Sequence, residues 1–331
     1  MFKDYLDYIY LSNPSYLDNS ITGIGSVYTI HYQNRELPYT TSAQGKNLYQ
    51  LIRKMYSELS ERIGFSCYSY LDRKTFALNL ENLKIKKCLT IDWGIGHTLQ
   101  IGNIDTTGTA AGTISKKVIK KAIFELLEKN ELYFFWYLNN GQRLNISSVI
   151  NLFLKREGME KFENYFFEVQ TLSLYYTVIY IAIKDNHIVA TGISCSPYRY
   201  ESVKNAIAEA KIIYMFNLRR GSLYLDSSEL EHKEACKFIK SNKFIAHNLK
   251  GKNINNNNIL RLKLSREVKN LSICLNTFFG DDPGSKIISA MSPTLLKCTP
   301  VKENILFSKS NLFLKEHPCS TLRTHVDCVV V

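Results

Sequence analysis

The chain has 331 residues, of which 45% are hydrophobic and 22% charged, and its net charge is +12. This length allows one large domain or two small ones, and the composition is ordinary for a globular protein. No apolar run approaches the roughly 18–20 residues needed to cross a bilayer, and the N-terminus lacks a signal-peptide pattern. We therefore expect a cytoplasmic protein without membrane contact. The positive charge favours anionic partners, but it forms no stripe of interleaved basic and aromatic residues, so we expect no nucleic-acid binding.

The eight cysteines include no Cys-x-x-Cys pair, so we expect free thiols. Four possible zinc ligands gather near the C-terminus: His317, Cys319, His325 and Cys328. Their spacing matches no zinc pattern, and we predict no metal site there.

Two strand-and-helix segments are predicted in the first half of the chain. Residues 21–33 alternate and are rich in β-branched and aromatic types, which is typical of a strand. A helix is expected from the N-cap Asn47 to Gly64, because apolar residues recur at helical spacing. Short apolar runs at 88–91 and 98–101 predict further strands.

A second helix follows the small-residue loop 106–113, with Ser115 as its cap, and continues through the aromatic residues 134–137. We expect these aromatic side chains to lie in the core. The apolar run 174–183 predicts a buried strand that pairs with 188–193 across a turn at 185–187.

A third helix is expected from about Glu201 to Asn217. The polar segment 249–260 predicts a loop, 271–275 a strand and 280–284 a turn. Strands and helices are mixed throughout without a convincing boundary, so we predict a single α+β (mixed α/β) domain over residues 1–331.

One pattern occurs twice: a glycine, a glutamate thirteen residues later, a second glutamate three positions on, and then a basic residue. Glutamates at i and i+3 share one face of a helix, so two such helices can direct four carboxylates toward one place. Clustered carboxylates need cations, and such a site suits Mg²⁺ with the phosphates of a nucleotide. The alternative is that each copy forms an exposed i,i+4 ion pair. The copies are Gly45, Glu58, Glu61, Arg62 and Gly112, Glu125, Glu128, Lys129.

These motifs resemble the YcaO family of ATP-dependent enzymes that modify peptide backbones. The resemblance covers about residues 20–215, includes Ala206 and Glu209 of the third helix, and leaves 216–331 unassigned. It implies a YcaO-like domain that binds ATP between the helices, and it names no particular catalytic side chain. It implies Mg²⁺ ligands at Glu58, Glu61, Glu125 and Glu128, and phosphate contacts at Lys46, Arg62 and Lys129.

In this family, a peptide Cys, Ser or Thr side chain attacks the preceding carbonyl, and ATP phosphorylates the resulting oxyanion. Loss of phosphate leaves a thiazoline or oxazoline, and the same activation can form a thioamide or amidine. The resemblance thus implies a cyclodehydratase of ribosomally made peptides, as in bacteriocin maturation. It also implies a precursor peptide, a separate partner protein that binds the leader peptide, and a homodimer.

Several positions depart from the family pattern. Lys54 stands where a small serine is usual, Thr113 where asparagine is usual, and Lys117 where glutamate is usual. Each lysine places positive charge where a metal ligand is expected, and an ammonium cannot template metal geometry. A second hypothesis follows: a catalytically degenerate YcaO-like subunit that binds peptide or scaffolds a modification complex.

Overall fold

The computed structural model describes residues 8–11, 21–26, 30–32, 35–38, 40–71, 73–98, 102–241, 262–277, 286–308, 311–318 and 327–330. Among these residues, none of the helices has the length and apolar character that a membrane crossing requires. Helices and antiparallel sheets are mixed along the chain, which confirms the predicted α+β class.

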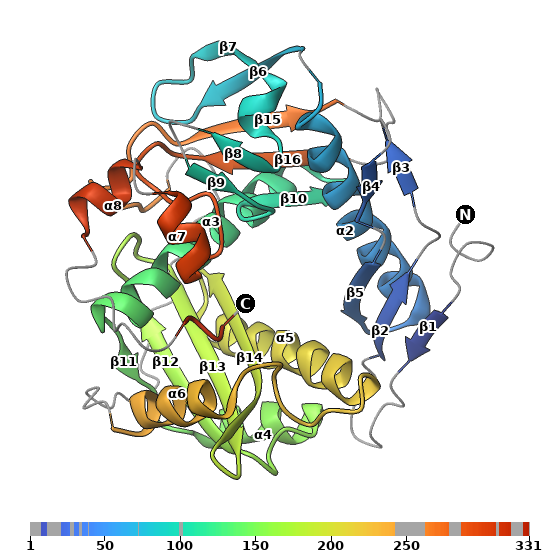
Figure 1. The fold of residues 1–331 in the computed structure, drawn as a ribbon, viewed down its shortest axis with the longest axis vertical. Helices are drawn as coiled ribbons and strands as arrows, with labels where there is room; N and C mark the ends of the chain where they lie inside the picture. Colours follow the sequence, from blue (N-terminus) through green and yellow to red (C-terminus); the bar gives the residue numbers. More distant parts are fainter. Residues whose placement is uncertain are drawn as a thin grey trace.

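Three sheets form the frame (Figure 1). The first holds β1 (Tyr8–Leu11), β2 (Ile21–Ser26) and β5 (Thr40–Gly45). The second has the order β10-β16-β15-β6-β7, from Thr109–Gly112, Lys286–Met291, Ser272–Asn276, Lys74–Asn79 and Ile85–Leu89. The third has the order β11-β12-β13-β14, from Gln142–Arg143, Glu163–Val169, Tyr176–Lys184 and His187–Ser196. Two small hairpins pair β3 (Ile30–Tyr32) with β4 (Arg35–Leu37) and β8 (Gly96–Thr98) with β9 (Gly102–Ile104).

The helices fill the space between the sheets and cover their outer faces. They are α2 (Leu48–Tyr68), α3 (Ser115–Leu138), α4 (Ser148–Glu157), α5 (Arg199–Arg219), α6 (Glu229–Ser241), α7 (Lys302–Phe307) and α8 (Leu312–Glu316), with a 3-10 turn η1 at Thr90–Trp93.

Helix α3 is the central element, because it lies between the second and third sheets (Figure 1). It packs on β10 and β16 on one side and on β12, β13 and β14 on the other. Its aromatic residues Phe135 and Trp136 are buried in the largest hydrophobic core, as the sequence predicted. Burial of this apolar surface is the main force that holds the two sheets around the helix.

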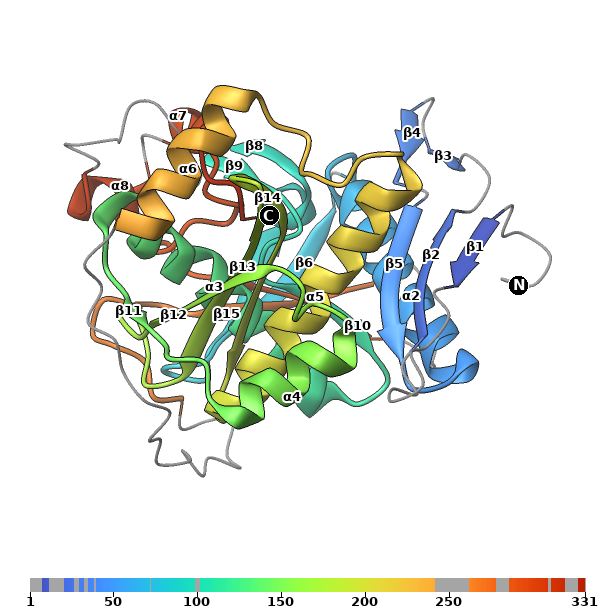
Figure 2. The same cartoon turned by 90° about the horizontal axis from the view of Figure 1, so that it is seen from below.

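Helices α4 and α5 cover the opposite face of the third sheet and form a second core with it. Helix α5 also touches β2 and β5, so the first sheet lies beside it (Figure 2). The close approach of α5 to β14 depends on Gly192. A Cβ at Gly192 would lie 2.1 Å from the carbonyl oxygen of Ala206, so only glycine fits there.

The predicted element types agree with the structure in most places, but several boundaries were wrong. The predicted strand 21–33 is divided between β2 and β3, which belong to different sheets, and the predicted strand 88–91 is divided between β7 and the 3-10 turn η1. Asn47 caps α2 by accepting a hydrogen bond from the Gln50 amide, as predicted. Gly64 does not end the helix, which continues to Tyr68, because Gly64 packs closely against Asn276 and Ile287 of the second sheet. Ser115 is the first helical residue rather than the cap, and its hydroxyl accepts from Lys286.

The hairpin between β13 and β14 also forms as predicted. Asp185 and Asn186 have φ values of 52° and 59°, and two positive values in succession are typical of a tight hairpin turn. The predictions for 249–260 and 280–284, and those for Cys319 and His325, fall outside the described residues. Every described cysteine is a free thiol.

The unassigned C-terminal part completes the second sheet. Strand β16 pairs with β10, and β15 lies between β16 and β6. The end of the chain reaches the third sheet, where the Thr191 hydroxyl donates to the carbonyl of Val329. Strand β10, which leads into α3, is held in place by its pairing with β16, whose residues are distant in sequence.

Candidate active site: a carboxylate cluster between three strand-helix units

Each glutamate-bearing helix directly follows a strand. In the first unit β5 leads to α2, in the second β10 leads to α3, and in the third β14 leads to α5. Gly45 and Gly112 end the strands of the first two units, so the repeat found in the sequence is a repeated strand-glycine-helix unit. Helix α2 packs on β10, and α3 packs on β14, which brings the three units together.

In the first and third units, a glutamate of the helix is hydrogen-bonded to the strand of its own unit; these glutamates are Glu58 and Glu209. One oxygen of Glu58 lies 2.7 Å from the Thr41 hydroxyl and 3.0 Å from the Ser42 amide, both on β5. Glu209 accepts from the Ile193 amide of β14 at 2.7 Å. Both carboxylates are thereby oriented by the strand preceding their helix.

The second glutamates of α2 and α3 bond to the strand of the next unit instead. The Thr109 hydroxyl of β10 donates to Glu61, and the Cys195 amide of β14 donates to Glu128 at 2.6 Å. These contacts interlock the three units through their carboxylates. Thr109, Cys195 and Ile193 were not singled out by the sequence, because such contacts join residues far apart in the chain.

Glu125 differs from the other four glutamates. Among the described residues, its half-buried carboxylate makes no hydrogen bond or salt bridge, although it interacts electrostatically with Glu61 and Glu128. Burial and then the charge of Glu61 raise its pKa well above the ordinary value. A carboxylate held near others without a bonding partner is suited to bind a cation.

Three of the other four carboxyl groups, those of Glu61, Glu128 and Glu209, also have raised pKa values. Burial raises the pKa of Glu61 and of Glu209. Burial, reinforced by the charge of Glu209, raises the pKa of Glu128 to about 8. These three carboxyl groups and that of Glu125 therefore resist ionisation, and nearby positive charge stabilises their charged forms.

Three lysines supply that positive charge. Lys129 interacts with Glu125, Glu128 and Glu209. Lys297 is 1% exposed and donates to the Thr107 carbonyl, and burial lowers its pKa to about 8 despite Glu125 and Glu61 nearby. Neither Lys297 nor Lys121 was a sequence candidate. Burial lowers the pKa of Lys121, but four nearby carboxylates raise it, and the pKa is higher than the ordinary value as a result. These carboxylates belong to Glu61, Glu125, Glu58 and Glu128.

The other predicted phosphate contacts are placed less favourably. Arg62 forms a 2.6 Å salt bridge with Glu58, so the first copy does form the i,i+4 pair considered as the alternative. No such salt bridge joins Glu125 and Lys129 in the described part of the chain. Lys46 is exposed, and its backbone amide donates to the side-chain oxygen of Gln50. The second copy thus fits the site hypothesis better than the first.

The donor set suits a divalent cation in chemistry, since Mg²⁺ prefers carboxylate oxygens. The described side chains do not form a preassembled cage, because no three Asp, Glu, His or Cys residues among them converge at metal-binding distance. Four of the five glutamates are held by hydrogen bonds. The ammonium of Lys121 is close enough to interact electrostatically with Glu61, Glu125, Glu58 and Glu128. Glu125 is the carboxylate most available as a cation ligand.

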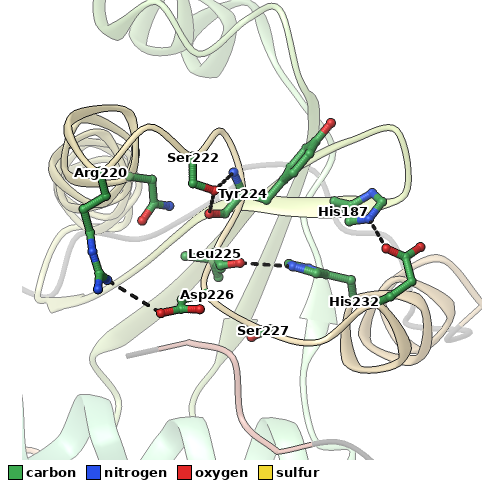
Figure 3. Close-up of a pocket in the computed structure, with 10 residues that line it drawn as sticks. His187, Arg220, Ser222, Tyr224, Leu225, Asp226, Ser227 and His232 are labelled. Carbon is green, nitrogen blue, oxygen red and sulfur yellow. Dashed lines mark hydrogen bonds and ion pairs between the residues drawn. The ribbon is translucent and has the colours of Figure 1, made fainter.

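A pocket of about 490 Å³ lies elsewhere, between the β13–β14 turn, the end of α5 and the start of α6 (Figure 3). His232 is fully engaged there, since its Nδ1 accepts from the Ile188 amide and its Nε2 lies 3.1 Å from the Leu225 carbonyl. This arrangement requires the neutral ring, and burial lowers its pKa.

His187 in the same pocket has the opposite protonation preference. Its ring nitrogens lie 2.8 Å from the Asp185 carbonyl and 2.7 Å from the Glu229 carboxylate, so both must donate. The bond to Glu229 raises the His187 pKa. Both histidines therefore serve to fasten this turn to α6, and none of the cluster glutamates lines the pocket.

Comparison with solved structures places the fold. YcaO from Methanopyrus kandleri, bound with AMPPCP and Mg²⁺, superimposes with a TM-score of 0.67 at 11% identity, covering 93% of this chain and 89% of that one. The chain adopts a YcaO-like fold. A chain of the E. coli microcin synthetase McbBCD complex matches with a TM-score of 0.62 at 12% identity, covering 87% and 88%. A heterocyclase in complex with substrate and cofactor matches with a TM-score of 0.60 at 10% identity, covering 89% of this chain and 52% of that one.

No protein-family model matches the sequence, and no curated protein sequence does. The YcaO-like fold is consistent with the resemblance found in the two glutamate motifs. At these identities the likeness establishes the fold, and the role of each site residue stays a prediction.

Proposed function

We propose that this chain binds a nucleotide at the carboxylate cluster and uses ATP to activate a backbone amide of a peptide. The observation that carries the proposal is the carboxylate of Glu125, which makes no hydrogen bond or salt bridge with the described residues. It lies near Lys121 and Lys297, where three strand-helix units meet. This cluster of opposite charges lies in a fold whose similar structures include one bound with AMPPCP and Mg²⁺.

The cluster would hold Mg²⁺ mainly through Glu125, with Glu61 and Glu128 beside it. ATP would supply the phosphoryl group that turns the amide oxygen into a leaving group, and Mg²⁺ would neutralise charge on the phosphates. Glu58 would contribute less to Mg²⁺ binding, because one of its oxygens already accepts hydrogen bonds from β5 and the other contacts Arg62. Lys129 would bind phosphate oxygens as a point charge, and the buried Lys297 would add positive charge behind the carboxylates.

The rest of the chain's contribution is positioning. The Cys195 and Ile193 amides hold Glu128 and Glu209 in fixed orientations, and Thr109 holds Glu61. A preorganised charge set stabilises charge that develops during phosphoryl transfer without having to reorganise. The net result for the peptide is the loss of one water as a side-chain sulfur or oxygen closes onto the backbone carbonyl carbon.

The proposed partners are a ribosomally made precursor peptide and a separate leader-binding protein. Support comes from the fold, since a McbBCD complex with pro-MccB17 bound also matches, with a TM-score of 0.61. A homodimer is proposed on the same resemblance.

Mass spectrometry tests this function. The chain is incubated with ATP, Mg²⁺, and the precursor peptide and partner protein encoded beside its gene. We expect the peptide to lose one water per modified Cys, Ser or Thr, with stoichiometric ADP formation. If the complete mixture forms no ADP and the peptide loses no mass, the proposed catalysis is contradicted.

A second candidate is the catalytically degenerate scaffold. It is favoured by the ammonium of Lys121 beside carboxylates that form no metal cage among the described residues. Peptide binding by a chain that leaves both ATP and peptide unchanged would support this reading.

A further inference from the structure

A lysine precedes the glutamates in both copies of the repeat. Lys54 stands four residues before Glu58, and Lys121 stands four residues before Glu125. Helices α2 and α3 are continuous across these positions, so each lysine lies one turn before its glutamate on the same helix face. The repeated motif is therefore lysine, glutamate, glutamate and a basic residue.

Lys121 is placed between the two copies. Its charge interacts with Glu58 and Glu61 of α2 as well as with two glutamates of its own helix. Lys121 is exposed as a residue, although neighbouring groups desolvate its ammonium, and it makes no hydrogen bond or salt bridge among the described residues. An ammonium has three donors, and here all three remain available to a ligand.

Lys54 adds a second cation beside it. Its ammonium donates to the Gln44 carbonyl at 2.6 Å, and it lies within electrostatic range of Lys121 and of Lys204 on α5. Three like charges from three helices repel one another, and an anion bound between them would relieve that repulsion.

We propose that Lys121, assisted by Lys54, supplies the nucleotide phosphates with positive charge that a divalent ion would otherwise provide, so that nucleotide binding does not require Mg²⁺. This inference rests on the proposed nucleotide site. A lysine ammonium binds phosphate as a point charge through charge-assisted hydrogen bonds, but it does not impose octahedral geometry. Mg²⁺ would then serve turnover rather than affinity.

Calorimetric titration with AMPPCP, in excess Mg²⁺ or in EDTA, tests this on the full chain. We expect the parent to bind in EDTA within about tenfold of its affinity in Mg²⁺. Lys121→Gln should weaken binding in EDTA by at least about tenfold, the loss expected for one charge-assisted hydrogen bond, and should change binding in Mg²⁺ much less. Lys121→Arg should retain binding in EDTA.

Lys116→Gln is the matched control, because it removes one exposed positive charge from the same helix on a different face. It should leave both affinities unchanged. Binding by the parent in Mg²⁺ but not in EDTA overturns the inference and leaves the nucleotide site intact. Equal behaviour of Lys121→Gln and the parent in EDTA also overturns it. No binding in either buffer overturns the nucleotide site itself.

Discussion

Replacing Glu125 by glutamine is expected to lower Mg²⁺-dependent ATP turnover by about 100-fold or more. Glu125 is the cluster glutamate without a hydrogen bond among the described residues, so its carboxylate is free to hold a cation. The amide keeps the shape but loses the charge. Steady-state ADP release, measured with the complete peptide and partner mixture, gives the result.

The same substitution should not lower the melting temperature. Burial and the charge of Glu61 raise the Glu125 pKa, which means that the ionised carboxylate opposes folding. Removing that charge should leave stability unchanged or higher, as is common for functional groups under strain. Glu303→Gln on α7, an exposed position, is the control and should affect neither quantity. Unchanged turnover with Glu125→Gln would show that ATP is not used at this cluster.

Gly192→Ala is expected to destabilise the protein by more than about 3 kcal/mol. The added Cβ would lie 2.1 Å from the Ala206 carbonyl oxygen and 2.8 Å from the Ala210 amide nitrogen. Both are backbone atoms of α5, so the helix must move away from β14. The bond from the Ile193 amide to Glu209 would then be lost.

Chemical denaturation measures this effect, and Gly112→Ala is the matched control. A Cβ at Gly112 meets only the Val118 side chain, at 3.1 Å, so we expect a loss below about 1 kcal/mol. Equal stabilities of the two variants would mean that α5 does not need its close approach to β14.

The sequence predicted the helices of the site because their signals are local. Asn47 is an N-cap, apolar residues recur at helical spacing, and the glutamates follow each glycine at the same distance. The tight turn at Asp185 and Asn186 was readable for the same reason. Gly64 misled the prediction, since a glycine can end a helix or allow close packing, and tertiary contact decides which.

The bonding within the cluster could not be predicted, because it joins distant segments. Thr109 on β10 bonds Glu61 of the preceding unit, and Cys195 on β14 bonds Glu128. Lys297 enters from the C-terminal part, where no sequence motif marks it. Lys121 had a local signal, since it matches Lys54 in the other copy, but its importance depends on the helices meeting.

A crystal structure of the chain soaked with AMPPCP and Mg²⁺ tests the central claim most directly. The account predicts the phosphates between α2, α3 and α5, within contact of Lys121 and on the side of Glu125. Nucleotide bound away from these three helices, with Glu125 and Lys121 untouched, would contradict it.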